Sequence, residues 1–222
     1  MRETTPGDAD RSARDALVQR VAQVVIDDPA AVAELEALEE FFVALDTDLD
    51  EETCRLAARA LFVAAEQRPA AVAERTDTVR ALLGIGEPAI QAWCAGAVGR
   101  LAASDPEAAA SVAGPVRELL NHDDDTVQHN AVEALATLAR ERPDAVAPAG
   151  DQLHELLGHD DVAIKHNAMG ALGVLAPTHP EVVVPAVETI AGLTYHDEQA
   201  VRNVAKGTLA QLARERSDAL EQ

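Results

Sequence analysis

Apolar residues recur along this chain with a period of 37 residues. One column of prolines and four columns of mainly apolar residues keep this step. They are Pro69, Pro106, Pro143 and Pro180; Ile90, Val127, Ile164 and Val201; Cys94, Ala131, Ala168 and Ala205; Val98, Leu135, Leu172 and Leu209; and Leu101, Leu138, Leu175 and Leu212. A fixed period of about 20–50 residues is typical of stacked supersecondary units. The pattern therefore predicts a repeat protein.

Each unit contains two apolar stripes with helical spacing. In the unit that begins at Pro143, the stripes are Val146, Leu153, Leu156 and Leu157, followed by Ile164, Ala168, Ala171, Leu172 and Leu175. Residues 158–161 separate them, because Gly is favoured just after a helix and Asp caps the next one. Pro148 and Pro185 fall inside first helices and are expected to kink them. Each unit is therefore a pair of helices.

The second stripe of each unit resembles a known motif. The runs Val127-x-x-x-Ala131-x-x-x-Leu135-x-x-Leu138 and Val201-Arg202-x-x-Ala205-x-x-x-Leu209-x-x-Leu212 resemble the second helix of a HEAT repeat. The proline, the paired leucines and the acidic turn before this helix are also HEAT-like, and the resemblance covers about residues 30–215. It implies an all-α superhelical solenoid in which second helices line the concave surface. It does not specify one function, because such arrays serve many roles.

The repeat boundaries predict one domain of about five helix pairs behind a capping helix. The capping helix spans residues 12–27, with Leu17, Val21 and Val24 facing inward, and the pairs begin near Pro29, Pro69, Pro106, Pro143 and Pro180. The solenoid covers residues 11–216, and residues 1–10 and 217–222 are expected to be flexible. Thr208 and Gln211 stand where other repeats carry mostly small or apolar residues, which suggests a polar outer cap.

Charge adds an expectation about environment. Asp and Glu number 39 against 18 Lys and Arg, giving a formal net charge of -21, and only Lys165 and Lys206 are lysines. This composition resembles that of cytoplasmic proteins from halophilic archaea, and an ordinary acidic regulatory protein is the alternative. The acidity argues against nucleic-acid binding. Without an apolar run of about 18 residues, no membrane span is expected, and the N-terminus lacks targeting features, so a cytoplasmic location is predicted.

Positions 2, 5, 6 and 9 face away from the predicted core when each second helix is counted from its Val or Ile, or from Thr53 in the first repeat. These twenty positions include one acid, Glu133, and three basic residues, a local reversal of the overall charge. With the adjacent position 3, they give a candidate partner-binding groove: Arg55, Arg59, Phe62, Trp93, His129, Asn130, Val132, His166, Asn167, Met169 and Lys206. Alternatively, the small residues among them only permit tight superhelical curvature. Trp93 is either a partly exposed anchor or a buried filler.

Polar residues within the repeat leave further alternatives. Asn130 and Asn167 would satisfy polar groups of a neighbouring helix or hold the backbone of a partner. His122, His159 and His196 keep the 37-residue step, each followed by an acid. Equivalent residues of stacked repeats lie roughly 8–10 Å apart, too far to share one metal ion. These histidines are therefore expected to contact helix-end carbonyls and acidic neighbours, with a weak surface cation site as the alternative.

The sequence carries none of the catalytic signatures sought. Phosphate-binding glycine loops, GxSxG, HExxH and DxDxDG motifs are absent, and Cys54 and Cys94 give no disulfide framework. The chain is therefore predicted to be a non-enzymatic adaptor without cofactor or metal, monomeric or dimeric, that binds a peptide or helix, possibly an acidic one, along the concave groove. An accessory or lyase-like HEAT protein holding a cofactor or client is the alternative. A DNA-repair glycosylase is disfavoured because it would need a basic, aromatic concavity.

The net charge leads to a first prediction. Self-repulsion at a charge of -21 opposes compaction, and molar salt shortens the screening length to about 3 Å. We expect the thermal unfolding midpoint, followed by circular dichroism, to rise by several degrees between dilute buffer and molar KCl. A midpoint that stays constant or falls would show that charge repulsion does not limit stability.

Overall fold

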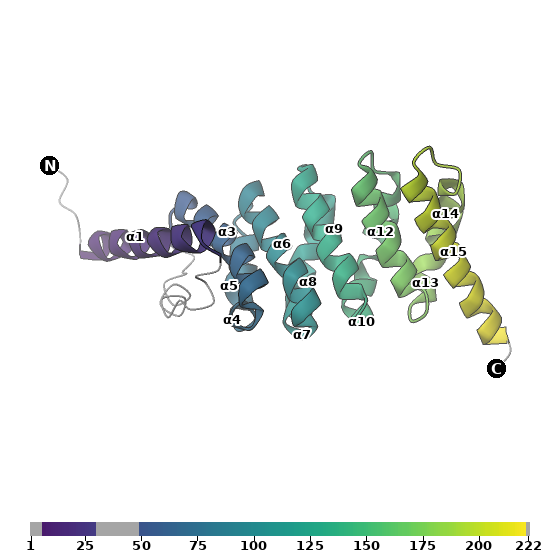
Figure 1. The fold of residues 1–222 in the computed structure, drawn as a ribbon, viewed down its shortest axis with the longest axis horizontal. Coiled ribbons are helices and arrows are strands. Elements are labelled where there is room, and N and C mark those ends of the chain that lie inside the picture. The colour runs from purple at the N-terminus through teal and green to yellow at the C-terminus, as the bar shows by residue number, and fades with distance from the viewer. Residues whose placement is uncertain (1–5, 30–48, 221–222) are drawn as a thin grey trace.

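The computed structural model describes residues 6–29 and 49–220, and these residues form an all-helical array. The helices stack along one long axis, with α1 (Pro6–Asp27) and α15 (Gln199–Leu220) at opposite ends (Figure 1). The predicted all-α superhelical solenoid is confirmed. The first helix of the pair expected to begin near Pro29 lies largely outside the described residues. None of the described helices is both long and apolar enough to cross a membrane.

Two kinds of helix alternate in each repeat. The second helix of each repeat packs on the second helix of the next repeat: α3 (Glu51–Gln67), α6 (Pro88–Ser104), α9 (Asp125–Ala139), α12 (Val162–Leu175) and α15. The first helices are broken into short pieces. They are α4 (Pro69–Ala73) and α5 (Thr76–Leu83); α7 (Pro106–Ser111), α8 (Ala113–Glu118) and η2 (Leu119–Asn121); α10 (Pro143–Val146), η3 (Ala147–Ala149), α11 (Gly150–Glu155) and η4 (Leu156–Gly158); and α13 (Pro180–Val183), η5 (Val184–Ala186) and α14 (Val187–Leu193).

Pro148 and Pro185 explain two of these breaks. Each lies in the middle of a 3₁₀ turn, η3 or η5, that interrupts the first helix of its repeat. Proline lacks the backbone N–H that an uninterrupted α-helix requires and clashes with the preceding turn. The kinks expected from the sequence are therefore present.

Carboxylates begin the second helices, as the Asp positions predicted. The side chain of Asp161 accepts hydrogen bonds from the backbone N–H groups of Ala163 and Ile164, at 2.7 and 3.1 Å. The hydrogen bond from Ile164, followed by that from Ala163, lowers the pKa of Asp161. Asp124 caps α9 in the same way, and Glu87 caps α6 through the N–H of Ile90. These caps satisfy donors that a helix start leaves unpaired.

The rings of the turn histidines make a contact in addition to those expected. His122 Nδ1 accepts the backbone N–H of Asp124, and His159 Nδ1 accepts that of Asp161, both at 2.9 Å. His196 Nδ1 accepts the N–H of Glu198 at 3.1 Å. The expected contacts are also present: the backbone N–H groups of the same three histidines donate to the last carbonyls of the first helices, at 3.1 Å, and Nε2 of His159 lies 3.7 Å from Asp125. Each ring holds the residue just before a second helix, because its nitrogen lies two residues upstream of an N–H group that needs an acceptor.

The capping helix packs on α3 through an apolar stripe. Val18, Val21, Ala22 and Val25 are buried, whereas Val24 is 42% exposed, so the inward assignment of Val24 was wrong. The stripe runs through positions i, i+3, i+4 and i+7 from Val18, and Val24 falls outside it. Helix α1 begins at Pro6, earlier than the expected residue 12.

The predicted polar cap at the C-terminal end is also corrected. Thr208 is only 5% exposed, and its Oγ1 lies 3.0 Å from the position that a Cβ on Gly173 would occupy. This side chain therefore faces the preceding repeat rather than the outer end. A hydroxyl fits there because Gly173 leaves room for it.

Close packing between first helices gives a second prediction. A Cβ on Gly150 would lie 2.2 Å from Val182 Cγ1, and a β-branched side chain has little freedom to move away. We expect Gly150→Ala to lower the free energy of unfolding by about 1–3 kcal/mol, measured by urea denaturation. Gly192→Ala in α14 is the matched control, since nothing lies within 4 Å of its added Cβ. It should be neutral or stabilising by up to about 1 kcal/mol. Equal losses in the two variants would contradict this packing.

Candidate functional site

One column of the predicted groove lies inside the solenoid. Val132 and Met169 are both 0% exposed, so their assignment to an open groove was wrong. Ala58 and Ala95, at the same position of α3 and α6, are also buried. The reason is that each second helix is covered by the second helix of the following repeat as well as by its own first helix. Lys206 shares this column but is exposed, because α15 is the last stacked helix that the structure describes.

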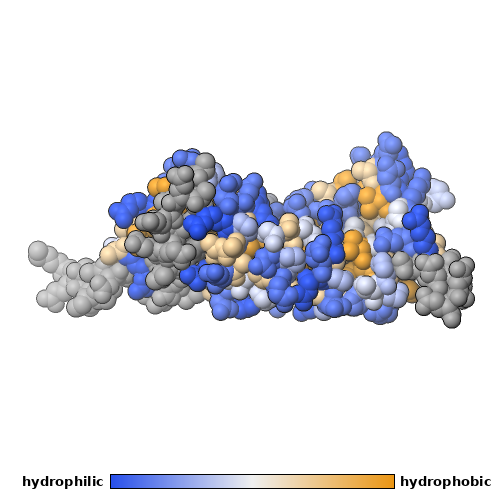
Figure 2. Space-filling view, turned by 60° about the horizontal axis from the view of Figure 1, so that its bottom comes forward, coloured by the Kyte–Doolittle hydropathy of each residue, from blue (hydrophilic) through white to orange (hydrophobic). Residues whose placement is uncertain are grey.

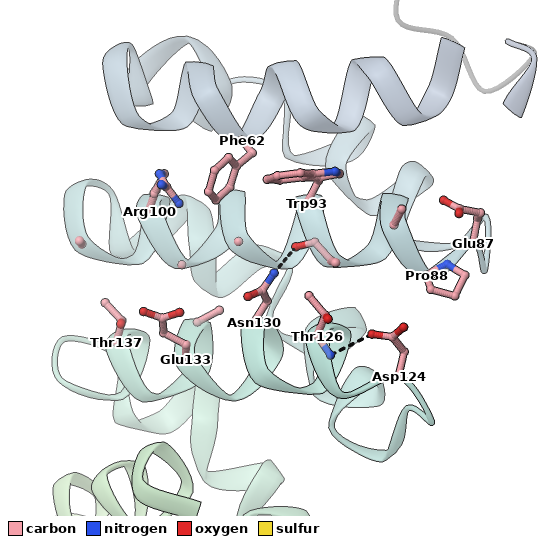
Figure 3. A pocket seen from close by; sticks show the side chains of 16 residues that line it. Phe62, Glu87, Pro88, Trp93, Arg100, Asp124, Thr126, Asn130, Glu133 and Thr137 are labelled. Carbon is pink, nitrogen blue, oxygen red and sulfur yellow. Dashed lines mark hydrogen bonds between the residues drawn. The ribbon is translucent and has the colours of Figure 1, made fainter. Parts of the chain in front are cut away.

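A hollow of about 880 Å³ opens between α6 and α9, with α3 at its upper edge (Figure 3). Three of the predicted groove residues, Phe62, Trp93 and Asn130, line it together. The other described lining residues are Glu87, Pro88, Ala89, Ala92, Gly96, Gly99, Arg100, Ala103, Asp124, Thr126, Glu133, Ala134 and Thr137. The lining is thus contributed mainly by two adjacent repeats rather than by the whole array.

Aromatic side chains form one wall of the hollow. The rings of Phe62 and Trp93 are 5.0 Å apart between centroids and tilted by 58°, a favourable edge-to-face type of contact. Both side chains are half-buried. The Arg100 guanidinium lies 3.5 Å from the centroid of the Phe62 ring, and that of Arg59 lies 5.8 Å from the Trp93 ring. Two cations therefore flank the aromatic pair.

Glycine shapes the space beside this wall. A Cβ on Gly96 would lie 2.7 Å from Cε2 of Phe62, so the Phe62 ring occupies the place of a side chain at that position. On Gly99, a Cβ would lie 3.4 Å from Cα of Ala134, which shows how closely α6 and α9 approach. Gly96 and Gly99 therefore allow the ring to settle on α6 while the hollow stays open. Small residues here therefore have a packing role and also border the hollow.

Asn130 links the two helices that border the hollow. Its Nδ2 donates a hydrogen bond of 2.9 Å to the backbone carbonyl of Ala92 (Figure 3). The interhelical role that the sequence left open is therefore present. This bond fixes the side chain and uses one of its two amide protons, while the Oδ1 acceptor takes no part in it.

The remaining polar residues of the predicted groove lie outside this hollow. His166 and Asn167 line a smaller depression of about 460 Å³ near the starts of α12 and α15. His166 Nδ1 is 3.4 Å from Asn167 Oδ1. His129 points toward Glu133, with 3.8 Å between its Nε2 and Oε2. The single groove expected from the sequence is thus split into two places.

The predicted basic rim is partly neutralised. Arg55, one of its residues, lies 3.0 Å from Glu51 and 3.7 Å from Glu87. Arg59 contacts the Trp93 ring instead. Exposed ion pairs of this kind are weak, but they reduce the positive field at the rim. The local excess of positive charge inferred from residue counts is therefore smaller than expected.

Sequence reasoning missed several lining residues. Arg100 and Thr137 share position 10 of the second helix, one position beyond the columns considered. Both are polar residues that are half-buried in the structure. A polar residue next to the core columns is the signal that could have identified them as candidates for the lining. Glu87 and Asp124 cap α6 and α9, and their position beside the hollow depends on the stagger between these helices. No repeat column contains that information.

The described residues provide little for chemistry. No group of three or more His, Cys, Asp or Glu side chains among them is placed to hold a metal ion. Cys54 and Cys94 are buried, and burial raises the pKa of both thiols, which opposes formation of the reactive thiolate.

Comparisons with known proteins identify the architecture. No family model and no curated protein match this chain. Among solved structures, it is similar to an engineered protein at 25% identity, covering 89% of this chain and 97% of that one, with a TM-score of 0.69. A second engineered protein is 27% identical with a TM-score of 0.72, and the match covers 95% of this chain but 56% of that one. A designed armadillo repeat protein in complex with the peptide (KR)4 is 19% identical, covers 94% and 95%, and has a TM-score of 0.74.

The fold is thus an armadillo- or HEAT-like helical solenoid. Its similarity to designed armadillo repeat proteins supports this repeat fold. The expected HEAT-like architecture is therefore confirmed at the level of the repeat fold.

The contact between Phe62 and Gly96 gives a third prediction. We expect Gly96→Ala to displace the Phe62 ring from Trp93, since the added Cβ would lie 2.7 Å from Cε2. The near-ultraviolet circular dichroism of Trp93, the only tryptophan, should change, and the unfolding midpoint should fall. Gly170 lies in the same column two repeats later, and nothing lies within 4 Å of an added Cβ there. Gly170→Ala should therefore leave the spectrum unchanged and should not lower the unfolding midpoint. An unchanged Trp93 spectrum in Gly96→Ala would contradict the described contact.

Proposed function

We propose that this protein is a non-enzymatic adaptor that binds a short segment of a partner protein in the hollow between α6 and α9. The observation that carries the proposal is the half-buried Phe62–Trp93 pair beside Gly96 and Gly99. Aromatic residues make up only 2% of the chain, and two of them meet at an open hollow. Rigid aromatic side chains in a partly desolvated pocket are typical anchors of binding energy.

The rest of the described surface offers less to a partner. One face of the molecule is mostly hydrophilic, with small separate apolar areas (Figure 2). The large hydrophobic side chains that are clearly exposed among the described residues are scattered over different elements: Val24, Ile85, Val184 and Tyr195. Isolated apolar residues of this kind are normal on a soluble protein, whereas a lined hollow is a specific feature.

The geometry favours a short segment over a long helix. A helix with its side chains is about 10–12 Å wide, and groove-bound helices place several anchors along more than two turns. Here the aromatic wall is confined to one place: the column of Trp93 continues as Asn130, Asn167 and Val204, although Gly170 and Gly173 repeat the glycines in α12. One or two partner side chains would enter the hollow, and Asn130 Oδ1 would accept a backbone N–H of the segment.

A blocking variant tests this proposal. Ala103 is exposed at the edge of the hollow, and Arg140 and Arg214 occupy its column in other repeats, so Ala103→Arg suits the fold. Peptides would be selected from a displayed random library on the wild-type protein in molar KCl. We expect the selected peptides to shift Trp93 fluorescence and to bind Ala103→Arg at least about tenfold more weakly, because arginine closes one end of the hollow.

Ala210→Arg is the matched control, an exposed alanine on α15 away from the hollow. It should bind the selected peptides like the wild type. If the library yields no peptide that shifts Trp93 fluorescence, or if Ala103→Arg binds as well as the wild type, the hollow is not the binding site. Substitution of Met169 would not serve here, since its side chain is fully buried and a charge there would test folding.

A further inference from the structure

The hollow carries more negative than positive groups. Glu87, Asp124 and Glu133 line it, against Arg100 as the one cationic side chain among the described lining residues. Arg100 is already engaged by the face of the Phe62 ring and by Glu66. The three carboxylates therefore dominate the charge that an incoming segment meets, contrary to the expectation of an acidic partner.

These carboxylates keep acceptor capacity for a ligand. Glu87 uses Oε2 for the N–H of Ile90, and its Oε1 lies 3.7 Å from Arg55. Asp124 uses Oδ1 for the N–H groups of Thr126 and Val127. An ionised carboxylate offers about four lone-pair sites, so each retains room for a further donor. Both lie at helix starts, where the helix dipole offsets part of their charge. Glu133 lies in the middle of α9 and has no such offset; the one ion-pair partner described for it is the imidazole of His129, at 3.8 Å.

The aromatic wall is closed to a partner's cation. Arg100 already covers the Phe62 ring at 3.5 Å, and Arg59 lies over the Trp93 ring at 5.8 Å. A lysine or arginine stacking on this pair would meet these two guanidinium groups. The part of the hollow beside Gly96 and Gly99 therefore suits an uncharged apolar side chain, while a cationic side chain has its acceptors on the α9 side.

We infer that the partner is a basic segment with one apolar anchor: an uncharged side chain enters beside Gly96 and Gly99, and a flanking lysine or arginine meets Glu133. This assignment rests on the proposed function and adds the chemical class of the partner. Complementary charge contributes orientation and discrimination between partners, and the apolar anchor contributes most of the affinity.

Four defined peptides test the anchor and the charge separately. The reference probe is the N-acetylated, C-amidated peptide Ser-Lys-Lys-Leu-Lys-Lys-Ser. The others replace its Leu with Ala, its Leu with Lys, or all its Lys with Glu. Binding is followed by Trp93 fluorescence at the lowest KCl concentration at which circular dichroism shows folded protein. We expect the reference to bind tightest, the Ala and Lys replacements to bind about tenfold more weakly, and the Glu peptide to bind several-fold more weakly.

A charge reversal separates local recognition from bulk charge. Glu133→Arg introduces the residue that Arg59 already provides in the same column of α3, so it suits the fold. This variant should bind the lysine-containing reference peptide several-fold more weakly than the wild type does, and the glutamate peptide more tightly. Glu141→Arg makes the same change of net charge at an exposed position outside the hollow and should leave the preference unchanged.

The outcomes distinguish this inference from the proposed function. Three outcomes would overturn the inference. They are tighter binding of the glutamate peptide than of the reference, equal effects of Glu133→Arg and Glu141→Arg on peptide affinity, or no binding of any defined peptide. In each case, a library-selected peptide that Ala103→Arg excludes would still support the proposed function. A reference peptide that loses affinity in Glu133→Arg, but not in Glu141→Arg, supports the inference.

Discussion

The close approach of successive second helices governs this structure. Helix α6 meets α9 where a Cβ on Gly99 would lie 3.4 Å from Ala134, and α12 meets α15 at Gly173 and Thr208. Contacts this short require small side chains on at least one helix, and the core is accordingly built from Ala, Val and Leu. The hollow between α6 and α9 has to be compatible with this spacing.

Bulky side chains fit such an array only where a neighbour gives way. Phe62 lies against α6 because Gly96 leaves the space of a side chain empty, and Trp93 then packs on Phe62. The same residues thus serve packing and leave an opening beside it. The two interpretations of the small residues, tight curvature and a binding surface, are therefore compatible. Gly99 permits the close approach of the helices, and Gly96 both permits packing and borders the hollow.

The 37-residue columns predicted the fold well because periodicity reports which faces are buried. They located the helix pairs, the kinks at Pro148 and Pro185, and the caps at Asp124 and Asp161. They misplaced Val132 and Met169 because a helix in a solenoid is covered on two sides, and so its buried arc is wider than one amphipathic stripe. Arg100 and Glu133 show the other limit, since charge on a face depends on which partners lie opposite, and that is a property of stagger between helices.

The hollow is restricted to α3, α6 and α9, so its shape does not depend on how many repeats the array contains. Residues beyond α9 repeat the same supporting contacts without lining the hollow. Duplication or loss of a whole 37-residue unit between α12 and α15 would therefore change the span of the molecule while leaving the hollow as it is. An array of this kind can evolve its reach and its recognition independently, because only one of the two depends on how many units it contains.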